Sequence, residues 1–205
     1  PASKIVDSQF PSALGTLGKL VKIPGIAWPS FDPKNLELSA QAVADEFRNL
    51  DFFDFVDLRR SLKPSGEPGS PAVLARRQGS PDAPHVLLYA HHDVQPPGDR
   101  NLWKTEPFEA TLVGERLFGR GASDDKAGII THLHSIKTLI ELAKEIHLGM
   151  TVFIEGEEEA GSESFPAFLA ENESELAADL IVVADSSNWT EDVPALTTSL
   201  RGAVS

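Results

Sequence analysis

The sequence predicts an α/β fold, a three-layer sandwich in which a mostly parallel sheet lies between helices on both faces. Two observations support this prediction. Apolar runs of strand length alternate along the chain with segments whose apolar residues recur at helical spacing. Several of these runs are apolar at nearly every position, which is typical of strands covered on both faces, as in residues 86–89 (VLLY), 150–154 (MTVFI) and 180–184 (LIVVA).

The first half of the chain contains two amphipathic helices and three strands by these criteria. Apolar residues at helical spacing place a helix over residues 8–22, which Pro24-Gly25 ends. Ser39 is a suitable N-cap for a second helix that runs to about Leu50. The predicted strands are residues 52–58, 72–77 and 85–91.

The second half continues the alternation of helices and strands. Residues 110–113 and 116–118 indicate a hairpin that turns at Gly114-Glu115. The longest helical pattern follows, from Lys126 to about Ile146. The remaining predicted elements are a strand at 150–154, a helix at 165–169, a strand at 180–184 and an extended segment from Pro194 to Leu200.

Composition and charge exclude several classes of function. The 205 residues carry a net charge of −13, which disfavours nucleic acid or an anionic membrane as partner. No run of about 18 apolar residues is present, and the first residues do not resemble a signal peptide, so we expect a cytoplasmic protein. Because the chain has no cysteine, a metal ion would have to be held by His, Asp and Glu.

An apolar strand ends abruptly in two imidazoles and a carboxylate, at residues 91–93 (HHD). Side chains alternate along a strand, so His91 and Asp93 point the same way and His92 points the other way. A His followed two residues later by an acid is typical of a metal ligand and the group that orients it. A plain hydrogen-bonded pair is the alternative for these residues taken alone.

Acidic residues follow three other apolar strands or turns. Asp124 precedes the long helix, residues 155–159 (EGEEE) follow one strand, and Asp185 closes another. Taken singly, these acids also suit a helix N-cap, a solvated acidic turn and a turn cap, respectively. Four carboxylates within the five residues 155–159 repel one another, however, and their position after a buried strand favours bound cations.

Together these strand and loop ends predict a metal centre at one edge of the sheet. Carboxylate oxygens and imidazole without sulfur suit Zn²⁺, with Mn²⁺ or Co²⁺ as alternatives. The number of candidate ligands exceeds what one ion needs. We therefore expect two divalent ions about 3.5–4 Å apart, bridged by a carboxylate.

Four motifs occur in a characteristic order: residues 91–96 (HHDVQP), 103–108 (WKTEPF), 119–126 (GRGASDDK) and 155–162 (EGEEEAGS). Their order and spacing resemble the M20 metallopeptidases. The Asp-Val-Gln-Pro and Asp-Asp-Lys variants resemble most the branch of carnosine dipeptidases and non-specific dipeptidases.

The resemblance implies a role for each candidate residue. The implied metal ligands are His91, Asp124 as the bridge, Glu159 and Asp185. Asp93 would orient His91, and Glu158 would be the general base that activates a water. The resemblance also implies a cis peptide bond between Asp124 and Asp125.

The resemblance also implies that part of the enzyme is absent from this sequence. The family has a second metal-binding His far downstream, beyond an inserted lid and dimerisation domain, and no His follows Asp185 here. Residues 1–198 are therefore interpreted as the N-terminal segment of the catalytic domain, and residues 199–205 as the start of the lid. A homodimer formed through the lid is expected, and the segment alone is expected to be inactive.

Three functions remain open at this point. The first is hydrolysis of the peptide bond in dipeptides or short peptides. The second is deacylation of an N-acyl amino acid by an enzyme of the same family, such as a desuccinylase, deacetylase or aminoacylase. The third is metal binding without catalysis, which the absent His favours for the segment but which an intact Glu158 disfavours for the parent protein.

Overall fold

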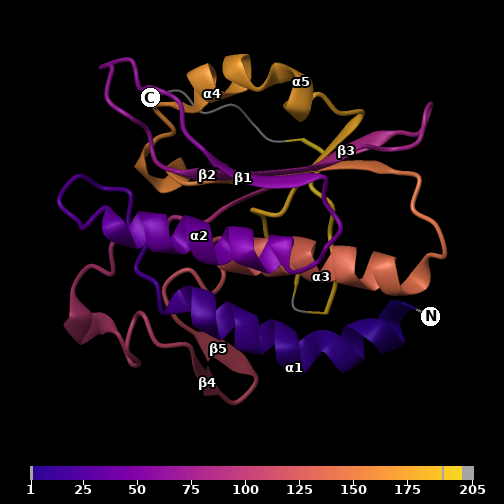
Figure 1. The fold of residues 1–205 in the computed structure, drawn as a ribbon. Helices are drawn as coiled ribbons and strands as arrows, with labels where there is room; N and C mark the ends of the chain where they lie inside the picture. Colours follow the sequence, from indigo (N-terminus) through magenta and orange to yellow (C-terminus); the bar gives the residue numbers. More distant parts are fainter. Residues whose placement is uncertain (1, 191, 200–205) are drawn as a thin grey trace.

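The computed structural model describes residues 2–190 and 192–199 of the chain. A five-stranded sheet lies between two layers of helices (Figure 1). The order of its strands is β1 (Phe55–Arg59), β2 (Ala72–Arg77), β6 (Gly149–Glu155), β3 (His85–His91) and β7 (Leu180–Val183). The predicted α/β class and the helices on both faces are confirmed.

The sheet is mixed. Strand β3 is parallel to both of its neighbours, β6 and β7, whereas β2 is antiparallel to β1 and to β6. The expected parallel arrangement therefore holds for the three strands that carry the candidate site. Strands β1 and β2 are consecutive and joined by a loop, which an antiparallel bridge between Leu62 and Pro68 closes. The crossover from β3 to β6 runs instead through a helix, as parallel pairing requires.

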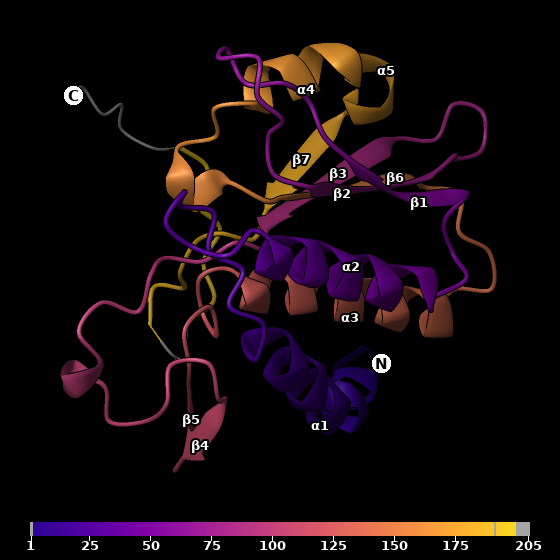
Figure 2. The ribbon, with the colours of Figure 1, turned by 60° about the vertical axis from the view of Figure 1, so that its left-hand side comes forward.

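The helices are divided unevenly between the two faces of the sheet. Helices α2 (Lys34–Arg48) and α3 (Lys126–Leu142) cover one face, and α1 (Ala2–Val21) packs against α3 as an outer layer (Figure 2). Helices α4 (Phe165–Glu171) and α5 (Glu173–Leu176) cover the other face (Figure 1). No helix in the described part of the chain is long and apolar enough to cross a membrane.

Apolar residues form a core on each side of the sheet. Along β2, Val73 and Ala75 belong to the core beneath α2 and α3, whereas Leu74 belongs to the core beneath α4. This alternation explains why the central strands are apolar at almost every position. Strand β7 differs, because it lies at the edge of the sheet and all four of its residues are exposed by 37–60%.

The bounds of β2 and β3 agree with the prediction to the residue. The prediction that Ser39 caps a helix is wrong. Helix α2 begins five residues earlier, and the Ser39 hydroxyl is buried inside it, where it donates to the backbone oxygen of His92 (3.2 Å). This contact spans 53 residues of sequence, so a local pattern cannot indicate it.

Other differences concern the ends of elements. Helix α1 begins at Ala2, helix α3 ends at Leu142, and the small hairpin consists of β4 (Thr111–Val113) and β5 (Arg116–Phe118). The extended segment predicted from Pro194 contains no regular strand over residues 194–199, and Leu200 lies outside the described residues. The predicted start of a lid at 199–205 also lies outside them, except for Ser199.

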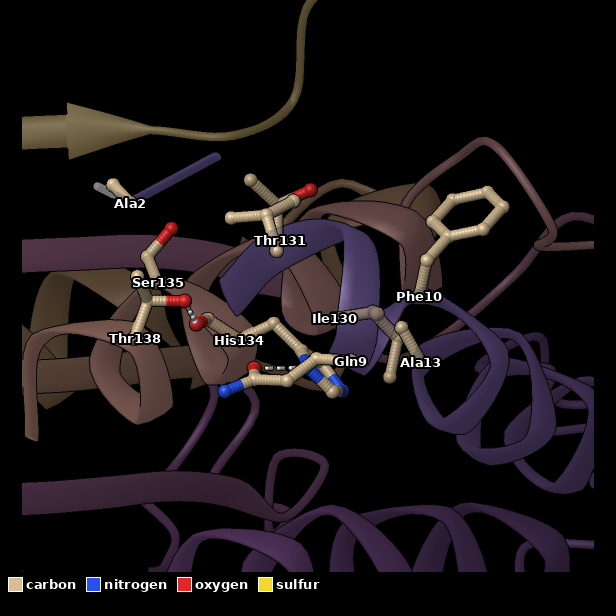
Figure 3. A pocket seen from close by; sticks show the side chains of 10 residues that line it. Ala2, Gln9, Phe10, Ala13, Ile130, Thr131, His134, Ser135 and Thr138 are labelled. Carbon is tan, nitrogen blue, oxygen red and sulfur yellow. Dashed lines mark hydrogen bonds between the residues drawn. The ribbon is translucent and has the colours of Figure 1, made fainter. Parts of the chain in front are cut away.

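A hollow of about 470 Å³ lies between α1 and α3 (Figure 3). Val6, Phe10 and Ala13 line it from α1, and His134 of α3 shares a hydrogen bond with Gln9 across it (3.0 Å). Among the described residues that line this hollow there is no carboxylate. The hollow therefore does not have the residues of a cation site, which is built elsewhere, at the ends of the strands.

Candidate metal centre

The carboxyl ends of β3, β6 and β7 meet at one edge of the sheet. In the parallel register His91 is level with Glu155, and Tyr89 is level with Val183. Asp185 follows β7 by two residues, and the short helix that begins at Glu158 follows β6. The structure thus brings together the strand ends from which the sequence predicts a site, at the position where parallel sheets commonly place one.

His91 lies at the centre of this edge and is fully buried. Its Nε2 is 3.0 Å from Oδ1 of Asp124, and 3.8 Å from both Oε2 of Glu158 and Oδ2 of Asp185. Its Nδ1 faces Asp93, at 3.1 Å from the backbone oxygen and 3.4 Å from Oδ1. One ring nitrogen is thus held by Asp93, and the other faces the carboxylates.

His92 points to the opposite side, as strand alternation predicts. Its Nε2 hydrogen-bonds to the backbone oxygen of Pro71 (2.8 Å), and the ring is fully buried. Burial lowers the pKa of His92 below its ordinary value. This histidine is a neutral structural group that joins the end of β3 to the loop before β2.

Asp93 has a second role that the sequence did not indicate. Its carboxylate is fully buried and accepts the backbone N–H groups of Glu158 (3.2 Å) and Glu159 (3.1 Å). One side chain therefore fixes both the imidazole of His91 and the backbone of the two adjacent glutamates.

The predicted bridging residue lies in an unusual pair of acids. Asp124 and Asp125 are joined by a cis peptide bond, as the resemblance implies. Asp125 is buried and caps α3, because Oδ1 of its carboxylate accepts the N–H group of Gly128 (3.2 Å). Its Oδ2 accepts the N–H group of His91 (3.1 Å) at the end of β3. The cap role considered for this segment belongs to Asp125, and the Asp124 side chain, 63% exposed, is free to face His91.

Within residues 2–190 and 192–199, two groups of side chains place their donor atoms within 4.8 Å of one another, and both include His91. The first adds Asp124 and Glu159, and the second adds Asp125 and Asp185. Each group offers one imidazole nitrogen and carboxylate oxygens, which is the donor chemistry that suits Zn²⁺, Mn²⁺ or Co²⁺. The residues present therefore fit divalent cations. Asp125, which the sequence did not single out as a ligand, belongs to one of the groups.

The electrostatics of the cluster reflect its excess of negative charge. Burial lowers the pKa of His91, but the carboxylates of Asp93, Asp125 and Glu158 outweigh burial and raise this pKa to about 10. Burial raises the pKa of Asp125 to about 7. Burial, together with the nearby Asp185 and Glu159, also raises the pKa of Glu158, although His91 opposes this. Without a bound cation, the His91 imidazole therefore carries a proton at neutral pH.

The other basic residues of these motifs are structural. The buried ammonium of Lys126 donates to the backbone oxygens of Leu20 and Ile23 (both 2.8 Å) and so binds the end of α1. Arg120 stacks over the ring of Trp103, with its guanidinium carbon 5.3 Å from the ring centroid. On α3, His132 hydrogen-bonds to the backbone oxygen of Tyr89 (2.8 Å) rather than facing the carboxylates.

Known proteins share both the sequence pattern and the fold. Residues 87–197 match the model of the peptidase family M20/M25/M40. Beta-Ala-His dipeptidase of Rattus norvegicus is 34% identical over 78% of this chain and 33% of its own length. Cys-Gly metallodipeptidase DUG1 of Candida albicans is 30% identical over 98% of this chain and 44% of its own length.

A solved structure of a relative has a similar fold. The crystal structure of human carnosine dipeptidase 1 aligns with a TM-score of 0.77 and 26% identity, over 92% of this chain and 42% of that one. The chain thus spans less than half the length of these relatives. The family match covers more than half of the chain, including every candidate ligand. The chain therefore belongs to the peptidase family M20/M25/M40, in the branch whose members include the beta-Ala-His and Cys-Gly dipeptidases.

Proposed function

We propose that this chain is the metal-binding segment of a dinuclear metallopeptidase that hydrolyses the peptide bond of dipeptides or short peptides. One observation carries the proposal. Three strand ends and the turn before α3 bring His91 and four carboxylates into two groups, each with donor atoms close enough to hold one cation, and Glu158 is a further carboxylate that belongs to neither group. The names of the relatives, beta-Ala-His dipeptidase and Cys-Gly metallodipeptidase, support a dipeptide as substrate.

In this proposal two divalent ions are held by four side chains, those of His91, Asp124, Glu159 and Asp185. The ions are proposed to be Zn²⁺, with Mn²⁺ or Co²⁺ as alternatives. Bound cations of this kind polarise a scissile carbonyl and lower the pKa of water. Asp93 keeps Nε2 of His91 turned toward the carboxylates through its two contacts with Nδ1. A ligand whose orientation is fixed before binding costs less free energy to order when the ion arrives.

Glu158 is the general base of the proposal. Its side chain is 39% exposed, so substrate and water reach it, and its backbone N–H is fixed by Asp93. The pKa of Glu158 is raised above the ordinary carboxyl value and so lies closer to neutral pH. A general base that later returns its proton is most effective when its pKa is near the working pH. Glu158 takes a proton from the attacking water and delivers it to the leaving amine.

Deacylation of an N-acyl amino acid is the second candidate, because the same cluster supports attack on any amide. We propose further that the lid, the second metal-binding His and a homodimer interface belong to the part of the relatives' length that this chain does not span. A cytoplasmic location also stays a prediction. This chain on its own is expected to bind cations without turnover.

The test uses a polypeptide of the relatives' length that contains this chain. Its metal content is measured by elemental analysis, and its activity on dipeptides and on N-acyl amino acids is measured before and after chelation. Faster cleavage of dipeptides supports the peptidase, and faster cleavage of N-acyl amino acids supports the deacylase. Absence of bound metal together with no effect of the chelator would refute both.

Two neighbouring substitutions separate the roles of the glutamates. Glu158→Ala should abolish turnover and leave the metal content close to that of the parent. Glu159→Ala should lower the metal content itself. Substantial activity of Glu158→Ala would show that another group is the base.

A further inference from the structure

We propose that Gln95 is the positioning residue for Glu159: its amide holds one carboxylate oxygen and leaves the other available to a cation. The proposal rests on the function proposed above, because it takes Glu159 as a ligand. The Nε2 of Gln95 donates to Oε2 of Glu159 (2.7 Å) and to the backbone oxygen of the same residue (3.0 Å).

The segment that carries Gln95 is itself held rigidly. Val94 is fully buried, and its backbone N–H donates to the backbone oxygen of Gly25 (2.9 Å). On the other side of Val94, Asp93 accepts the backbone N–H of Glu159 (3.1 Å). Residues 93 and 95 therefore contact the N–H, the C=O and the carboxylate of Glu159 from one short segment. This arrangement restricts both the backbone and the side chain of the proposed ligand.

The chemistry of an amide suits this task better than that of the alternatives. A glutamine NH₂ donates without carrying a charge, so it orients the carboxylate and leaves its negative charge for a cation. A glutamate at position 95 would lack the donor and would repel Glu159. A lysine would compete with the cation for the same carboxylate. Groups that orient a ligand in this way typically change metal affinity about 10- to 100-fold when they are replaced.

The competing explanation is that Gln95 only stabilises the loop. The two explanations differ in what Gln95→Leu and Gln95→Met change. If Gln95 positions the ligand, both variants lower the affinity for Zn²⁺ about 10- to 100-fold in competition with a chelator. The urea midpoint of the metal-free protein then stays near that of the parent. If Gln95 is only a loop anchor, the urea midpoint falls and the metal affinity of the folded protein is unchanged.

Gln41 provides a matched control on the surface of α2. Its Nε2 donates to Oδ1 of Asp45 at the same distance of 2.7 Å, but both residues are exposed and neither belongs to a candidate ligand group. Gln41→Leu and Gln41→Met should leave the Zn²⁺ affinity unchanged. A loss of affinity in these variants equal to that of the Gln95 variants would overturn the proposal.

A double substitution tests whether Gln95 acts through Glu159. Glu159→Gln alone should weaken Zn²⁺ binding, and adding Gln95→Met should weaken it no further, because the oriented carboxylate is already gone. Independent losses that multiply would overturn the proposal. The absorption spectrum of the Co²⁺-loaded protein gives a second readout, which should change in Gln95→Met and stay that of the parent in Gln41→Met.

These outcomes separate the positioning role of Gln95 from the metallopeptidase function on which it rests. If the parent protein binds Zn²⁺ and the Gln95 variants keep its affinity and its Co²⁺ spectrum, the positioning role is wrong while the proposed function stands. If the parent protein binds neither ion, the proposed function fails, and the positioning role fails with it.

Discussion

Replacement of Asp93 by alanine should destabilise the protein even when no metal is present. Two part-buried backbone N–H groups, of Glu158 and Glu159, would lose their acceptor, and Nδ1 of His91 would lose a carboxylate neighbour. A buried donor left without a partner costs about 1–3 kcal/mol. Because two such donors lose their acceptor, we expect Asp93→Ala to lower the free energy of unfolding by about 2–5 kcal/mol.

Asp93→Asn should have an intermediate effect. The amide oxygen accepts one of the two N–H groups, but its NH₂ faces the other as a second donor. We therefore expect a loss of about 1–3 kcal/mol. The assay is urea unfolding in the presence of a chelator, which separates loss of folding free energy from loss of metal binding.

Asp54→Ala is the matched control for this comparison. Asp54 also accepts a backbone N–H group, that of Gln78 (2.6 Å), but in an exposed position away from the site. Its replacement should cost less than about 1 kcal/mol. If Asp93→Ala is as stable as the parent to within about 0.5 kcal/mol, the range of an ordinary surface substitution, the contacts of Asp93 do not stabilise the fold.

Three further predictions follow from burial and charge. Metal binding at pH 7.5 should release about one proton from His91, because its pKa is about 10 without a cation, and metal affinity should therefore rise with pH. Calorimetry in buffers of different ionisation enthalpy measures the number of protons released. The His91→Ala variant should not release this proton. Burial holds the pKa of His132 below its ordinary value, so the unfolded chain binds this proton first and stability falls as pH drops below about 6.5. The free energy of unfolding of His132→Gln should fall less between pH 7.5 and 5.5 than that of the parent, by up to about 1.4 kcal/mol per pH unit, as measured by urea unfolding. An equal fall in the two proteins would contradict this prediction. Phe47→Ala should lower the free energy of unfolding by about 3–5 kcal/mol in the same assay, because the ring is fully buried and packs edge-to-face against Phe53. A loss below about 1 kcal/mol would show that neighbouring side chains repack into the space of the ring.

The sequence predicts the parts of the site that depend on local pattern. The bounds of β3 follow from an apolar run that stops at polar residues, so the position of His91 at a strand end is predictable. The meeting of residues 91, 158–159 and 185 follows from the rule that parallel strands place their carboxyl ends on one edge. Asp124 reaches the same edge from the turn before α3, which this rule does not cover. The alternating directions of His91 and His92 follow from strand geometry alone.

The parts that depend on long-range contacts are not predictable in this way. Two adjacent acids, Asp124 and Asp125, are equivalent as a pattern, and only the structure shows that Asp125 is the one that caps α3. Gln95 and Glu159 are 64 residues apart, so no local spacing joins them. The antiparallel pairing of β1 with β2 cannot be predicted from local pattern either, because the long loop between the two strands lacks the short turn that marks a hairpin.

The exposed strand β7 determines how this chain behaves in isolation. Its residues, Leu180–Val183, are apolar and solvent-accessible, and in the described part of the chain the strand pairs on one side only, with β3. An exposed apolar edge of this kind is a template on which further strands can add, including those of other copies. Solutions of the chain alone should therefore contain aggregates that grow with protein concentration. A single charge on this edge, as in Ile181→Lys, should keep the chain monodisperse in light scattering.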